Sequence, residues 1–157
     1  MAKDRPSKAQ RVFEQSIYIQ ASATAVERCL TDLELMHRWL NPAVRCDPVG
    51  TWGTDLGDRS RFILKLPLEP ALNNQVVERE PGKIVWAFTG FFRGCDRWEC
   101  VPDGAGTLLL NRFAFEIPNP LVAWGFDRVA AGWVKGDMEA QLRRLKRVAE
   151  EVYYLQA

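Results

Sequence analysis

The chain has 157 residues, with 21 lysines and arginines against 20 aspartates and glutamates, which gives a net charge of +1 at neutral pH. This length predicts one domain with a sizeable core. The balanced charge gives no reason to expect nucleic acid as a partner, and no run of about 18 apolar residues predicts an integral membrane segment. The polar N-terminus lacks the apolar stretch of a secretory signal, so we expect a cytoplasmic protein. We expect residues 1–10 to form a flexible tail and residues 11–157 to form the domain.

The first elements after the tail are a strand and two short helices. Residues 12–20 are β-branched and aromatic, and residues 13, 15, 17 and 19 would share one face of the strand. Residues 25–30 and 32–38 then predict two helical pieces. Ser22 or Thr24 would cap the first piece and Asp32 the second, because these side chains accept hydrogen bonds from free backbone N–H groups.

The middle of the chain consists of short strand-like runs separated by glycine and proline turns. The runs cover residues 43–49, 59–66, 72–80, 83–89, 96–101 and 107–117. The connections are short, so neighbouring strands should pair as antiparallel hairpins. Together with the first strand they predict a seven-stranded antiparallel sheet, and the separation of helices from strands is typical of the α+β class.

The last part of the chain predicts one long helix over residues 119–154. Apolar residues recur every three or four positions and would form one buried stripe, namely Trp124, Ala131, Val134, Met138, Leu142, Leu145, Ala149 and Val152. A second apolar set, Val122, Phe126, Val129 and Trp133, would point the other way. One sheet cannot cover both faces of a helix, so the Phe126/Trp133 set should pack against another part of the chain, a partner subunit or a ligand. Of these we favour local packing or a homodimer. Gly132 and Gly136 would weaken the helix and mark a bend or a close approach.

Several short motifs resemble one known superfamily. The segment Val76-Val77-Glu78-Arg79-Glu80-Pro81-Gly82-Lys83-Ile84-Val85-Trp86 is similar to a hairpin of the START-related, Bet v 1-like superfamily (SRPBCC type). Arg97-Trp98-Glu99, followed by residues 102–107, resembles its next hairpin, and the element order also matches. The superfamily includes polyketide cyclases and dehydrases, lipid carriers and coenzyme Q-binding proteins. The resemblance implies a helix-grip fold, with the sheet wrapped around the C-terminal helix and a cavity for apolar or amphipathic molecules between them.

Alternation along the strands predicts which side chains face that cavity. The expected ligand-binding residues are mostly aromatic or aliphatic, with two polar members on the strands: Phe62, Leu64, Trp86, Phe88, Asp96, Trp98, Leu109, Asn111 and Phe113, together with Trp124, Arg128 and Ala131 on the helix. A buried polar group must be paired or serve a ligand. Asp96 would pair with Arg128, or with Arg112 if the register differs by one. Asp96 and Arg128 are therefore the candidates for catalysis, and a structural pair is the alternative.

Other chemistry finds no support in the sequence. The four cysteines form no CxxC pair, and the single histidine, His37, gives no zinc-type spacing. Nucleophile-elbow and nucleotide-binding motifs are also missing from the sequence. We therefore expect neither a metal nor a cofactor.

Three functions fit these features. The first is binding or carriage of a hydrophobic or amphipathic small molecule, such as a lipid, isoprenoid or polyketide-like compound, in an enclosed cavity between sheet and helix. The second is an enzyme of the cyclase, aromatase or dehydratase type that uses the same cavity without a metal. The third is a protein-interaction module that acts through the Phe126/Trp133 set.

Overall fold

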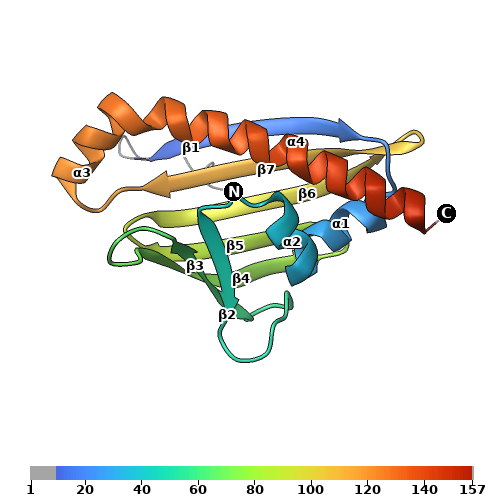
Figure 1. The fold of residues 1–157 in the computed structure, drawn as a ribbon, viewed down its shortest axis with the longest axis horizontal. Helices are drawn as coiled ribbons and strands as arrows, with labels where there is room; N and C mark the ends of the chain where they lie inside the picture. The colour runs from blue at the N-terminus through green and yellow to red at the C-terminus, as the bar shows by residue number, and fades with distance from the viewer. Residues whose placement is uncertain (1–9, 157) are drawn as a thin grey trace, which may run out of the picture.

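The computed structural model describes residues 10–156 (Figure 1). The expected flexible tail therefore lies outside the described residues, except for Gln10. The elements follow in the order β1 (Arg11–Ile19), α1 (Ala23–Thr31), α2 (Leu33–Trp39), β2 (Val44–Pro48), β3 (Arg59–Leu64), β4 (Ala71–Glu80), β5 (Lys83–Gly90), β6 (Arg93–Asp103), β7 (Gly106–Glu116), α3 (Pro120–Gly125), the π-helical turn η1 (Phe126–Ala130) and α4 (Ala131–Leu155).

The seven strands form one antiparallel sheet, as predicted, in the order β1-β7-β6-β5-β4-β3-β2. Strands β2 to β7 pair with their neighbours in sequence, and β1 closes against β7, the last strand. A tight turn at Gly82 connects β4 to β5 and requires a backbone φ of 78°, which glycine adopts without strain. Short hairpins of this kind are why the strand order follows the sequence so closely.

The two short helices begin at the predicted caps. The Ser22 hydroxyl accepts a hydrogen bond from the Ala25 amide at 3.2 Å, and Asp32 accepts one from the Leu35 amide at 3.0 Å. The indole of Trp39 donates to the Cys29 carbonyl at 2.8 Å and so joins the end of α2 to α1. These contacts fix both helices at one end of the sheet, beside the C-terminal half of α4 (Figure 1).

The long helix α3–η1–α4 lies along the sheet on the side of β1, and α4 packs against β1, α1 and α2 (Figure 1). The core is divided into two clusters. The larger one joins α1, α2 and the C-terminal half of α4 to the sheet through residues such as Leu30, Trp98 and Leu145. The smaller one surrounds Phe115 and Phe126 at the other end of the helix. The helix-grip architecture predicted from the sequence is confirmed.

The N-terminal half of the long helix corrects the predicted buried stripe. At η1 the Ala131 amide donates to the Phe126 carbonyl, five residues back instead of four, so the helix holds one extra residue in this turn. The extra residue shifts the phase of everything that precedes it. Phe126 is therefore buried, at 6% exposure, and Trp124 is exposed, at 59%. The predictions of an inward Trp124 and an outward Phe126 were both wrong.

The expected irregularity at the two helix glycines is also misplaced. Gly132 and Gly136 lie within the regular helix α4, and a Cβ added at either would meet nothing within 4 Å. The departure from α geometry lies at η1, just before them. The outward apolar face nevertheless exists, because Leu121, Val122, Val129 and Trp133 are each at least half exposed.

Candidate functional site

Two neighbouring rows of side chains cross the inner face of the sheet. The strand register aligns Trp86, Asp96, Phe113 and Phe13 in one row, over β5, β6, β7 and β1. The next row consists of Ile84, Trp98, Asn111 and Gln15. We call the six residues Phe13, Gln15, Asp96, Trp98, Asn111 and Phe113 the interior site. They bring polar groups to a face that is otherwise aromatic and aliphatic.

Most of the predicted ligand-binding residues on the strands do lie on this inner face. Trp86, Phe88, Trp98 and Leu109 are buried there. Phe62, Leu64 and Phe113 are half-buried, and Phe113 stacks on Phe88 with 5.2 Å between ring centroids. On the helix, Ala131 packs against the smaller core cluster. Phe113 keeps part of its surface accessible, so the inner face is not completely covered at the interior site.

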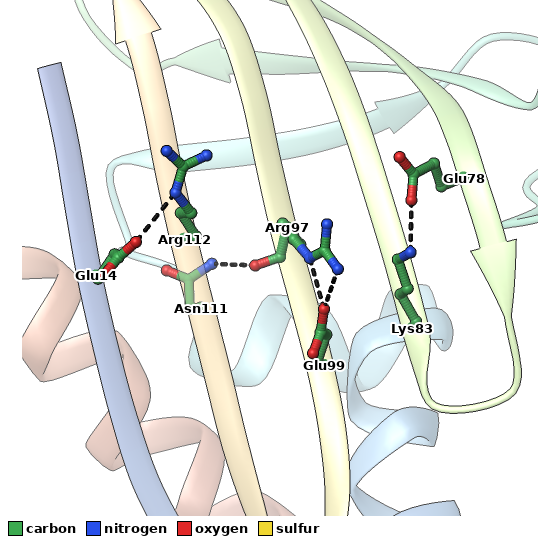
Figure 2. Close-up of polar contacts among 7 residues, drawn as sticks. All are labelled: Glu14, Glu78, Lys83, Arg97, Glu99, Asn111 and Arg112. Carbon is green, nitrogen blue, oxygen red and sulfur yellow. Dashed lines mark hydrogen bonds and ion pairs between the residues drawn. The ribbon is translucent and has the colours of Figure 1, made fainter. Parts of the chain in front are cut away.

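Asp96 is held by two uncharged donors. The Trp98 indole donates to Oδ2 at 2.9 Å, and the Asn111 amide donates to Oδ1 at 2.8 Å. The same Asn111 amide also donates to the Arg97 carbonyl at 3.1 Å (Figure 2). The indole of Trp98 is fixed in turn by Trp39, with 5.5 Å between ring centroids. The carboxylate is therefore oriented by a rigid set of neighbours.

The predicted partner of Asp96 was wrong. Arg128 lies on the exposed side of η1, where its guanidinium is 4.9 Å from the Trp124 ring. Arg112 lies on the outer face of β7 and binds Glu14 at 3.0 Å. No ion pair joins Asp96 to any cation among residues 10–156. The extra residue in η1 accounts for the position of Arg128, and the alternation of β7 accounts for that of Arg112.

Burial without a cationic partner governs the chemistry of this carboxyl. Desolvation raises the pKa of Asp96 from 3.8 to about 6, and the hydrogen bonds from Trp98 and Asn111 oppose this shift only in part. Asp96 is thus an acceptor at neutral pH that takes up a proton in mildly acidic conditions. Of the two catalytic candidates, only Asp96 lies inside the protein.

Gln15 is a member of the interior site that the sequence reasoning did not single out. Its Nε2 is 3.4 Å from the Lys135 carbonyl of α4, and its Oε1 is buried without a hydrogen-bond partner among the described residues. An unpaired buried acceptor costs free energy unless a ligand or water serves it. The signal was present, because Gln15 is the polar member of an apolar face that also holds Phe13, Ile17 and Ile19.

The outer face of the same strands is different in character. Figure 2 views it with the helices behind, and shows charged side chains paired along and across the strands. Lys83 binds Glu78 at 2.6 Å, and Arg97 binds Glu99. A hollow of about 390 Å³ lies over this face and shares two residues, Gln15 and Asn111, with the interior site. Its other lining residues are Glu14, Ser16, Arg97, Glu99, Leu110 and Arg112. Its charges are already paired with one another, so we place the candidate site on the inner face.

His37 and the possible metal ligands do not form a second candidate site in the part of the chain that the structure describes. His37 accepts a hydrogen bond from the Cys46 amide at 3.1 Å and connects α2 to β2. Within residues 10–156, no three histidine, cysteine or acidic side chains come together in a way that could hold a metal ion. No helix in that range is long and apolar enough to cross a membrane.

Fold and site together define a helix-grip protein with an inner face that combines aromatic rings and a few oriented polar groups. The family described as polyketide cyclase / dehydrase and lipid transport matches residues 10–150. The chain belongs to this family, which confirms the resemblance to START-related proteins. Family and fold together indicate a domain that binds hydrophobic ligands.

Solved structures give the same fold. A protein from Thermus thermophilus is 19% identical, with a TM-score of 0.72 over 88% of this chain and 97% of that one. A START superfamily protein from Mycobacterium smegmatis is 18% identical, with a TM-score of 0.64 over 93% and 99%. The structure of Ara h 8.0201 is 10% identical, with a TM-score of 0.64 over 89% and 97%. Among curated proteins, none gives a significant match.

Proposed function

We propose that this protein binds or carries a lipid, isoprenoid or polyketide-like molecule between the inner face of the sheet and the long helix. The observation that supports this most is the interior site itself. Phe113 and Asp96 lie on the inner face but keep part of their surface accessible, between two apolar clusters that fill the ends of the molecule. A ligand body would gain about 25 cal/mol for each Å² of apolar surface that it buries there.

Uptake of a neutral fluorescent lipophile tests the proposal. N-phenyl-1-naphthylamine should brighten on binding to the wild type. Phe113→Ala should weaken that binding about tenfold or more, because a buried phenyl ring contributes about 1.5–3 kcal/mol. Leu110→Ala is the matched control, since Leu110 lies on the outer face of the same strand. Equal losses in both variants, or no uptake by the wild type, would contradict binding at the interior site.

An enzyme of the cyclase or dehydratase type is the second candidate. The observation in its favour is Asp96, whose pKa of about 6 suits proton exchange near neutral pH. Arg128, the other candidate for catalysis, is exposed on the surface of the helix and does not reach the interior site. Mass spectrometry of polyketide-like compounds incubated with the protein distinguishes the two functions. Compounds that are bound but recovered unchanged would support carriage, and a loss of water or a new ring would support the enzyme.

We also propose that the protein acts in the cytoplasm. The four cysteines are free thiols, and three of them, Cys29, Cys46 and Cys100, are buried. Free thiols are typical of a reducing compartment. Fractionation of cells that express the tagged full-length chain tests this location.

A further inference from the structure

We propose that the interior site recognises the hydrogen-bond donors at the polar end of its ligand, so that it accepts an alcohol or an ammonium group and discriminates against a carboxylate. This inference rests on the proposed binding function and adds the chemical class of the ligand. It follows from which groups of the interior site are already paired and which are free.

Asp96 has acceptor capacity to spare. A carboxylate offers about four lone-pair positions, and the described residues fill two of them, through Trp98 and Asn111. Both donors are uncharged, so the negative charge has no counter-ion among the described residues. A ligand hydroxyl would add a third hydrogen bond, and an ammonium group would add a charge-assisted one.

Gln15 presents a second free acceptor on the same face. Its Oε1 is buried and unpaired among the described residues, while its Nε2 points to the Lys135 carbonyl. Gln15 lies directly across from Asn111 in the β1–β7 register, one strand further from Asp96. The amide of Asn111 between them is used twice, by Asp96 and by the Arg97 carbonyl. The free polar atoms of the site are thus mostly acceptors, on Asp96 and Gln15, and the second N–H of Gln15 Nε2 is the donor that remains.

The cations near the inner face are engaged elsewhere. Arg79, which lies on the inner face of β4 opposite Ile84, binds Glu27 at 2.6 Å. Arg144 of α4 donates from Nε to the Trp39 carbonyl at 2.9 Å and lies 4.0 Å from Asp137. Its buried Nη2 has no hydrogen-bond partner among the described residues, but Arg144 lines a hollow with Arg38, Arg147 and Glu151, and that hollow contains no residue of the interior site. Asp137 itself accepts hydrogen bonds from Asn41 and Gln141. A ligand carboxylate beside Asp96 would therefore meet a like charge that no cation among residues 10–156 is paired with.

A matched series of twelve-carbon amphiphiles tests this inference. Dodecylamine, dodecan-1-ol and dodecanoate would each compete with N-phenyl-1-naphthylamine at pH 7.5, below their micelle concentrations. We expect the amine and the alcohol to displace the probe at concentrations about tenfold or more below that of the carboxylate, the usual effect of one hydrogen bond to a charged group. Asp96→Asn should reduce the advantage of the amine about tenfold and change the alcohol less, because asparagine keeps one carbonyl oxygen.

The controls separate this inference from the binding function itself. Glu99→Gln changes a carboxylate on the outer face of the same strand and should leave the ranking unaltered. A carboxylate that competes as well as the amine would overturn the inference and leave lipophile binding in place. Failure of the probe and of all three amphiphiles to bind would instead overturn the proposed function, and this inference with it. If Asp96→Asn fails to fold, the order in which the amine, the alcohol and the carboxylate displace the probe from the wild type still tests the inference.

Discussion

Replacement of Asp96 by asparagine should remove a pH-dependent part of the free energy of unfolding, which arises from the burial of this carboxyl. The pKa of Asp96 is raised from 3.8 to about 6 in the folded protein, mainly by desolvation. Between these two values the folded protein holds a proton that the unfolded chain has released. The free energy of unfolding must therefore fall as the pH rises from about 4 to about 6, and the loss is complete above that range.

The size of the effect follows from the two pKa values. A difference of about 2, at about 1.4 kcal/mol for each pKa unit, gives about 3 kcal/mol as the upper limit. Water that reaches the half-buried carboxylate lowers this figure. Asparagine does not titrate, so the stability of Asp96→Asn relative to the wild type should increase between pH 4 and pH 7 by up to this amount.

Urea denaturation of both proteins at pH 4, 5, 6, 7 and 8 measures the difference. Any effect of the amide on the hydrogen bonds from Trp98 and Asn111 is the same at every pH and cancels when the values are compared across pH. The other titrating groups are common to both proteins and cancel as well. A difference that stays constant with pH, or that shrinks as the pH rises, would refute the argument that Asp96 is a desolvated carboxyl without a counter-ion.

Three further predictions concern the helix and the sheet. Phe126→Ala should destabilise the fold by about 3–5 kcal/mol in urea denaturation, whereas Trp133→Ala should change stability by no more than about 0.5 kcal/mol, because the two side chains are 6% and 85% exposed. Gly94→Ala should lower the melting temperature sharply, because the new Cβ would lie 2.0 Å from the Ala114 carbonyl oxygen. Gly104→Ala is the control: its Cβ would meet nothing within 4 Å, so we expect a cost of only about 1 kcal/mol, which comes from the positive φ of this residue. If the outward helix face joins two copies, Trp133→Glu should halve the mass measured by light scattering, and an unchanged mass would exclude that homodimer contact.

The strands were predictable because alternation and turn chemistry act locally. The register that places Asp96, Trp98 and Asn111 on one face with Trp86 and Phe113 follows from a period of two and from short hairpins. The partner of Asp96 was not predictable in the same way. Sequence reasoning looked for a cation, but the structure pairs the carboxylate with an indole and an amide from the same and the adjacent strand. Uncharged donors of this kind occur at many positions and carry no distinctive pattern.

The π-helical turn η1 explains why the predicted positions of Trp124 and Phe126 were wrong. A helical stripe extended backwards from Val152 assumes a constant period, and one extra residue in η1 breaks that assumption. Phe126 thereby turns inward and packs edge-to-face against Phe115 and Phe92, with 5.5 Å between centroids in both pairs. This packing closes the smaller core cluster at the end of the helix, while Trp124 and Trp133 stay outside. The same turn that completes the core next to the interior site therefore places Trp124 on the surface. Trp133 follows the turn and is exposed on the regular period of α4, and no local packing covers it.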